Sequence, residues 1–210
     1  MKDKELLVAE GVVREYLLPR LSLLSSRPKM RALDGVSLTL GKGESFGIVG
    51  ESGCGKTITA LAVMGLIPSP PGRVAAGSIS LAGEDLVRAT DSRMREIRGN
   101  EVSMVFQEPM TSLNPVLTIG KQLTEALQLH LKLEKQAADD RAGELLEMVG
   151  IPEGRNRLTD YPHQFSGGMR QRVMIAMALS CNPKMLIACL LYTSDAADDT
   201  PCVDLGGRRI

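Results

Sequence analysis

GESGCGKT, residues 50–57, is the stretch that decides the fold of this 210-residue chain, because it fills the pattern G-x-x-x-x-G-K-[S/T]. The glycines permit backbone conformations that turn successive N–H groups inward, where they can surround an anion. The lysine brings a point charge to the β- and γ-phosphates of a nucleotide, and the threonine offers a hydroxyl to Mg²⁺. The candidate nucleotide-binding residues are Gly50, Glu51, Ser52, Gly53, Cys54, Gly55, Lys56 and Thr57.

The segments on both sides of this loop also favour a nucleotide site. Phe46–Val49 is a short apolar run, which predicts a buried parallel strand leading into the loop. Thr57–Leu66 is apolar and has no glycine or proline before Gly65, which predicts a helix whose N-terminal dipole faces the loop. The alternative is a glycine-rich turn that binds no nucleotide, and such a turn would need neither the strand before it nor the helix after it.

The rest of the chain alternates between strand-like and helix-like segments. Short apolar runs at residues 6–13, 36–40, 78–81, 102–106 and 185–188 predict strands, and the last two are expected to be buried. Thr118–Val149 is leucine-rich and helical in pattern, with a charged break around Ala137–Arg141. Strands at both ends with helices between them predict an α/β ATPase core that carries an inserted helical subdomain at about residues 110–165.

A second segment that suits a phosphate stands far downstream of the first. It reads FSGGMRQR at residues 165–172, and its serine is a good N-cap for a helix that runs to about Ser180. Two glycines at a helix start cost roughly 1 kcal/mol each relative to alanine, so they suggest that a phosphate approaches the backbone closely. The alternative is a capped amphipathic helix. In either case the methionines at 169, 174 and 177 are expected to pack in the core and not to form a cofactor site. The candidate residues are Ser166, Gly167, Gly168, Met169 and Gln171.

Gln107 follows the predicted strand at residues 102–106 directly. The side-chain carbonyl of a glutamine that leaves a buried strand can reach Mg²⁺ or an attacking water. Taken alone, such a glutamine can also be a solvated strand end. Its surroundings, FQEPMTSLNP at residues 106–115, favour the functional interpretation.

The two phosphate-binding segments, in this order, resemble the ATP-binding subunit of ABC transporters. FQEPMTSLNP and the stretch YPHQF at residues 161–165 closely resemble the subgroup that serves dipeptide, oligopeptide and nickel importers. The resemblance covers roughly residues 6–188, and it implies a P-loop NTPase core with an antiparallel β subdomain beside the helical one. It also implies that Tyr16 stacks on adenine, although a tyrosine on an early strand can equally be a core residue.

The same resemblance implies a mechanism and a set of partners. ATP would be sandwiched between the P-loop of one subunit and Ser166–Gly168 of a second, homologous ATPase subunit, with Thr57 and the catalytic Gln107 at the Mg²⁺ ion. Closure and reopening of this sandwich would move two membrane permease subunits, which receive substrate from an extracytoplasmic binding protein. The subunit would lie peripherally on the cytoplasmic face of the prokaryotic inner membrane, and no nucleic-acid partner is implied.

The resemblance ends after Ala188. The family places an aspartate for Mg²⁺ and a catalytic glutamate directly after this strand, whereas Cys189 and Leu190 stand here. Residues 189–198 translate from TGT CTC TTA TAC ACA TCT GAC GCT GCC GAC, which resembles a transposase adaptor of sequencing libraries, and residues 203–210 resemble the other end of that adaptor. We therefore expect a core incomplete at its C-terminus, a disordered non-native tail over residues 189–210, and no ATPase activity in this chain. A natural polar tail is the alternative.

Composition narrows the remaining choices. Lys plus Arg and Asp plus Glu balance at 25 each, which gives no support for a general nucleic-acid or membrane-surface binder. No apolar run reaches the roughly 18 residues of a membrane helix, and the charged start is not a secretory signal, so a cytosolic chain is expected. The rivals are a soluble ABC ATPase of DNA repair or translation, and a P-loop kinase or GTPase, which would not need the Ser-Gly-Gly turn. A further alternative is an assembly artefact without function.

Overall fold

The computed structural model of the chain describes residues 4–17, 28–51, 53–67, 72–106 and 112–189. These residues form two compact units that divide between Arg98 and Gly99, and each unit is described by itself. Residues 190–210, for which the sequence predicts disorder, lie outside the described residues. Within the described ranges, no helix is both long and apolar enough to cross a membrane.

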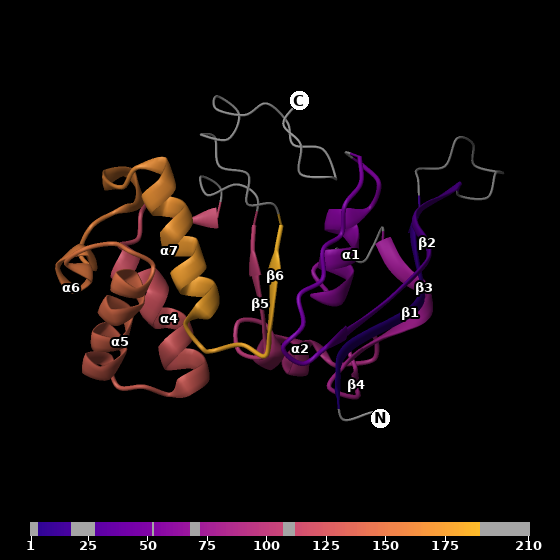
Figure 1. Ribbon diagram of the computed structural model, residues 1–210, viewed down its shortest axis with the longest axis horizontal. Helices are drawn as coiled ribbons and strands as arrows, with labels where there is room; N and C mark the ends of the chain where they lie inside the picture. The colour runs from indigo at the N-terminus through magenta and orange to yellow at the C-terminus, as the bar shows by residue number, and fades with distance from the viewer. Residues whose placement is uncertain (1–3, 18–27, 52, 68–71, 107–111, 190–210) are drawn as a thin grey trace. The chain divides into compact units, whose positions relative to one another are not determined.

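An antiparallel sheet forms most of the first unit (Figure 1), in the order β2-β1-β3-β4. Its strands are β1 (Glu5–Leu17), β2 (Lys29–Gly41), β3 (Gly72–Leu81) and β4 (Glu84–Asp85). Three of these strands contain the runs that the sequence predicts, and all three are longer than predicted. These strands extend into polar residues because β1 pairs with both β2 and β3. This pairing satisfies the backbone N–H and C=O groups whatever the side chains are.

Two helices complete the first unit, α1 (Lys56–Val63) and α2 (Asp91–Ile97). The predicted helix after the loop is confirmed, and it ends a turn earlier than the sequence suggests. The predicted buried strand Phe46–Val49 is wrong: the segment has no strand structure, and Phe46 and Val49 are 56% and 92% exposed. A strand needs a neighbour for its backbone hydrogen bonds, and no described strand pairs with this segment.

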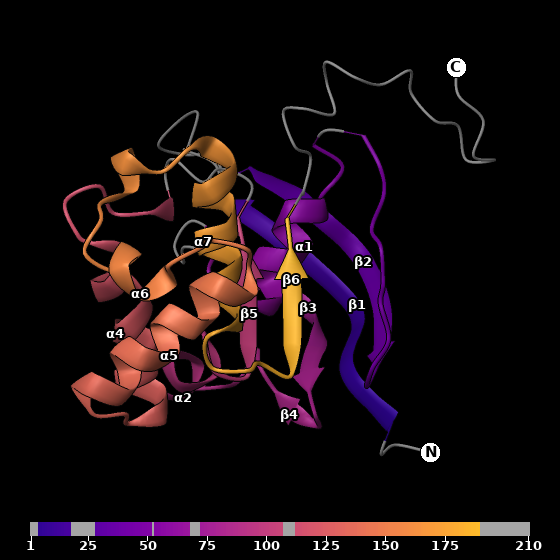
Figure 2. The same cartoon turned by 60° about the vertical axis from the view of Figure 1, so that its left-hand side comes forward.

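The second unit joins a two-stranded parallel sheet to a group of helices (Figure 2). Its elements are β5 (Val102–Val105), α4 (Ile119–Leu131), α5 (Lys135–Met148), α6 (Gly154–Arg157), a short 3-10 helix (Pro162–Gln164), α7 (Gly167–Leu179) and β6 (Met185–Ala188). Both predicted strands exist. The prediction of a buried strand is confirmed for β5, although Phe106 lies beyond its end. In β6 only Met185 is buried, and Leu186 is 43% exposed.

The break between the two long helices lies at residues 132–134, not at Ala137–Arg141 as the charge pattern predicts. Lys132 takes a left-handed conformation with φ 55°, which ends α4, and α5 begins three residues later. The charged residues of the predicted break lie within the first half of α5. They are tolerated there because they form ion pairs, such as that between Arg141 and Glu144, while Ala138 and Ala142 face the core.

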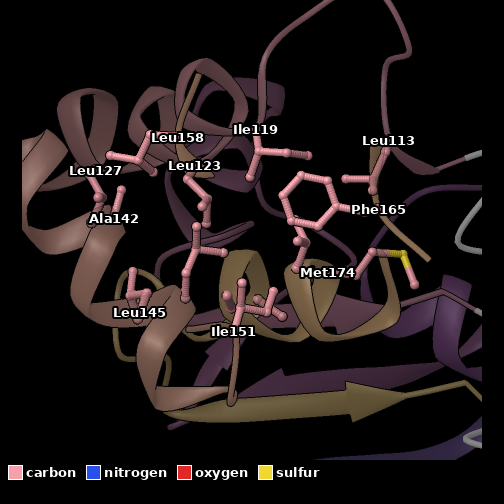
Figure 3. Packing of buried hydrophobic residues seen from close by; sticks show 14 of the residues in the cluster. Leu113, Ile119, Leu123, Leu127, Ala142, Leu145, Ile151, Leu158, Phe165 and Met174 are labelled. Carbon is pink, nitrogen blue, oxygen red and sulfur yellow. The ribbon is translucent and has the colours of Figure 1, made fainter. Parts of the chain in front are cut away.

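An apolar cluster holds these helices together (Figure 3). Ile119, Leu123 and Leu127 extend from α4, and Phe165 meets them from the turn before α7. Met174 is buried in this cluster, and Met169 and Met177 pack against it. The prediction that the methionines of this helix serve as core residues is therefore confirmed.

Candidate functional site

The loop before α1 has the backbone geometry that its glycines predict. Gly53 and Gly55 have φ values of 81° and 101°, in the left-handed region that residues with a Cβ avoid. An added Cβ on Gly50 would lie 2.7 Å from the Sγ atom of Cys54, an exposed side chain that would have to turn away. The backbone of the loop thus depends on glycine at Gly53 and Gly55. Ser52 lies outside the described residues.

Lys56 occupies the first position of α1 and turns its ammonium back over the loop. Its Nζ donates to the carbonyl oxygens of Gly50 at 2.6 Å and Glu51 at 2.7 Å, and it lies 3.6 Å from the Sγ atom of Cys54. The charge is therefore held where the loop and the helix N-terminus meet. Because the first N–H groups of a helix have no intrahelical partner, Lys56 and the first turn of α1 together fit an anion such as phosphate.

The surface of this loop is accessible. Glu51, Gly53, Cys54 and Thr57 are all exposed, so a ligand can reach the backbone and the threonine hydroxyl. In contrast, Thr59 is buried, and its hydroxyl donates to the carbonyl of Gly55 at 3.0 Å. That bond closes the first turn of the helix, which fixes the position of the loop above it.

Tyr16 lies near the end of β1, opposite Met30 on β2 and Gly72 on β3. Two residues before it, Arg14 pairs with Leu33 on β2. The Cδ2 atom of Leu33 lies 3.0 Å from the position a Cβ would take on Gly55. Tyr16 thus lies two residues, about 7 Å, along β1 from the residue that pairs with Leu33, which contacts the phosphate loop from β2.

The Ser-Gly-Gly turn begins α7 as the sequence predicts. The Ser166 hydroxyl accepts a hydrogen bond from the N–H of Met169 at 3.3 Å, so the predicted N-cap is confirmed. Gly167 and Gly168 are exposed, and a Cβ added to either would meet nothing within 4 Å. The backbone N–H groups at this helix start are therefore open to an approaching group. Gln171, the last candidate of this segment, is half-buried one turn further along α7.

Two arginines that the sequence analysis did not single out hold this turn in place. Nη1 of Arg170 donates to the carbonyl of Phe165 at 2.6 Å, which braces the residue before the cap. Nη1 of Arg172 donates to the carbonyl of Gly150 at 2.9 Å, which ties α7 to the end of α5. In the sequence, only their position within FSGGMRQR could have indicated this role, because their carbonyl partners are visible only in the folded structure.

The carboxyl ends of β5 and β6 meet at one edge of the parallel sheet. Val105 pairs with Ala188, and the N–H of Cys189 donates to the carbonyl of Val105 at 2.9 Å. Gln107, which follows this edge along the chain, lies outside the described residues, as does Leu190. Burial raises the pKa of the Cys189 thiol, which keeps it neutral near pH 7. A neutral thiol is a poor ligand for Mg²⁺, which prefers oxygen.

No group of three or more histidine, cysteine, aspartate or glutamate side chains in the described ranges could hold a metal ion. The residues available for Mg²⁺ are instead the Thr57 hydroxyl and, by prediction, Gln107. His163 stacks on Tyr161, with ring centroids 5.7 Å apart.

The chain matches the family described as ABC transporter over residues 33–188. It is 58% identical over 157 residues to the oligopeptide transport ATP-binding protein AppD of Bacillus subtilis, an alignment that covers 75% of this chain and 48% of that protein. It is 52% identical over 158 residues to the dipeptide transport ATP-binding protein DppD of Escherichia coli, with 75% and 48% covered. The chain thus spans about half the length of the curated relatives it matches.

The fold also has solved counterparts. The structure of the ATP-binding cassette MJ0796, in a dimeric post-hydrolysis state bound to ADP and Pi, superposes with a TM-score of 0.74 and 25% sequence identity. The match covers 91% of this chain and 78% of that one. The cassette cbiO1 of Clostridium perfringens, part of the transporter complex cbiONQ, matches with a TM-score of 0.65 and 22% identity.

Proposed function

Because the chain belongs to the ABC transporter family, we propose that it comes from the ATP-binding subunit of an importer for dipeptides or oligopeptides, with nickel as the other substrate of this subgroup. The observation that carries the proposal is the 58% identity with a peptide transport ATP-binding protein, because the alignment includes three quarters of this chain. The geometry of the phosphate loop supports the nucleotide part of the proposal independently.

The reaction of the whole protein would be attack of water on the γ-phosphate of ATP, in line with the leaving group. The backbone N–H groups of the loop and Lys56 would hold the β- and γ-phosphates and stabilise the charge that develops on them. Thr57 and Gln107 would hold Mg²⁺, which supplies charge neutralisation between the two phosphates. The remaining catalytic group, a carboxylate that polarises water, would stand after β6, where this sequence has Cys189 and Leu190.

The open start of α7 would complete the site of a second, homologous subunit. Its exposed glycines and its capped, braced turn present N–H groups and a helix dipole toward whatever approaches, which suits the γ-phosphate of a nucleotide held by the partner. The two ATPase subunits would drive a pair of membrane permease subunits supplied by an extracytoplasmic binding protein. The subunit would lie on the cytoplasmic face of the membrane.

Nucleotide binding by the 210-residue chain tests the first part of the proposal. Lys56→Ala should raise the Kd of MgATP in isothermal titration at least tenfold, because the phosphates lose their main side-chain charge. Lys42→Ala is the matched control, since Lys42 is an exposed lysine of the same unit outside the loop. Equal affinity in Lys56→Ala and the unmodified chain would contradict the nucleotide site.

Phosphate release tests the catalytic part. The chain as it stands should release phosphate no faster than Lys56→Ala, because neither Cys189 nor Leu190 can accept a proton from water at neutral pH. Turnover clearly above that control would show that another group performs the step. Transport itself is tested by whether the full-length subunit restores dipeptide, oligopeptide or nickel uptake to cells that lack their own ATPase subunit, and failure with all three would favour the non-transport ABC ATPases.

A further inference from the structure

Arg14 is a buried cation in the middle of the antiparallel sheet. Its side chain and backbone are only 4% exposed, yet Nε and Nη2 have no hydrogen-bond partner among the described residues. The neighbouring carboxylate of Glu15 is engaged elsewhere, with Lys29, Arg31 and Arg73 at 3.4–3.6 Å. A buried charge without an acid beside it costs stability, so its place in the fold calls for a function.

The guanidinium of Arg14 packs instead on the ring of Tyr16. The Cζ atom of Arg14 lies 5.5 Å from the centroid of the ring, within the range of a cation–π contact. Gly72 on β3 makes the contact possible, because a Cβ there would lie 2.5 Å from Nη2 of Arg14 and 2.9 Å from Cε1 of Tyr16. The three residues thus pack as one unit: Gly72 has no side chain, the guanidinium of Arg14 occupies the space this leaves, and the ring of Tyr16 packs against the guanidinium.

This unit is connected to the phosphate loop by the sheet. Arg14 pairs with Leu33, and Leu33 contacts the position of Gly55 at the start of α1. The tyrosine ring is therefore anchored on β1, the strand that pairs with the strand bordering the phosphate loop, β2. A ring that has a cation against one face can stack its other face on a second flat partner, such as the base of a nucleotide.

We propose that Arg14 is a positioning residue that holds the Tyr16 ring for stacking on the nucleotide base, with Gly72 providing the space for it. The inference rests on the proposed nucleotide-binding function and on the stacking role predicted for Tyr16. The arginine does not touch the phosphates. It reduces the rotamers available to Tyr16, so that less conformational entropy is lost when a base binds.

The decisive experiment compares two ligands that differ in having a base. Arg14→Met keeps an unbranched stem and removes the guanidinium with its charge, and it should weaken MgATP binding by about three- to tenfold in isothermal titration, the range of a partly desolvated cation–π contact. Binding of magnesium tripolyphosphate, which has no base, should not change. Arg14→Lys should recover part of the lost affinity for MgATP, because it restores the cation.

Two further variants test whether Arg14 acts through the Tyr16 ring or only through its positive charge. In a Tyr16→Leu background, Arg14→Met should cause no additional loss of MgATP affinity, because the ring through which it acts is gone. Arg73→Met removes a nearby positive charge that contacts Glu15, and it should leave both affinities unchanged. Circular dichroism confirms that each variant folds.

Three outcomes would overturn the inference. These are equal losses for MgATP and tripolyphosphate in Arg14→Met, additive losses in the double variant, or full affinity for MgATP in either Arg14→Met or Tyr16→Leu. A failure of the proposed function has a different signature. In that case Lys56→Ala would not change the affinity for MgATP or for tripolyphosphate. The two failures are therefore distinguishable within one set of titrations.

Discussion

Replacing Gln122 by leucine should destabilise the helical unit, because this side chain fastens the loop before α4 to the helix. Gln122 is 7% exposed. Its Oε1 accepts from the N–H of Asn114 at 2.9 Å, and its Nε2 donates to the carbonyls of Asn114 and Leu117, both at 3.0 Å. The amide thus pairs with the backbone of residues 114–117 and holds this segment against α4.

The size of the effect follows from these three bonds. Each contributes about 0.5–1.5 kcal/mol net, and leucine leaves the three backbone groups without their partner in a partly buried place. The apolar surface that leucine adds to the core offsets part of this loss, so we expect the free energy of unfolding to fall by ~2–3 kcal/mol. Gln128→Leu makes the same chemical change at an exposed position of α4, and it should cost no more than about 0.5 kcal/mol.

Urea unfolding followed by far-ultraviolet circular dichroism measures this difference, because the three longest helices, α4, α5 and α7, all belong to the second unit and dominate the helical signal. A loss in Gln122→Leu that is equal to or smaller than that of Gln128→Leu would refute the reasoning. It would mean that water replaces the glutamine amide at the loop without cost.

Two other predictions concern charge and glycine. Burial opposes ionisation of Glu15, but its three cationic neighbours prevail and hold the pKa of this carboxyl below its ordinary value of 4.5. The ionised form therefore stabilises the fold at pH values above the unfolded pKa, and that contribution is lost as the pH falls through the lower folded pKa. Glu15→Gln should therefore reduce the loss of unfolding free energy at low pH, measured by urea unfolding. Gly168→Ala should raise the free energy of unfolding by about 0.5–1 kcal/mol, since the space above it is open, and a loss of stability would show that the helix start is more crowded than the structure indicates.

The sequence determined the local features of this protein. The glycine pattern before α1 and the serine cap of α7 depend on neighbours within a few residues, and backbone conformation and capping are set at that range. The family was also readable from sequence, because the two segments that are predicted to bind phosphate have demanding spacing. The charged stretch Ala137–Arg141 misled the prediction, since helical ion pairs and two alanines allow it to continue as helix.

Only the tertiary structure decided which residues far apart in sequence support the site. Gln122 pairs with Asn114, Arg172 reaches Gly150, and Arg14 lies in a space that exists because residue 72 is glycine on another strand. The exposure of Phe46–Val49 belongs here too, because an apolar run becomes a buried strand only when a neighbouring strand satisfies its backbone. Sequence patterns report what a segment can form, whereas hydrogen-bond partners and packing space come from residues that only folding brings together.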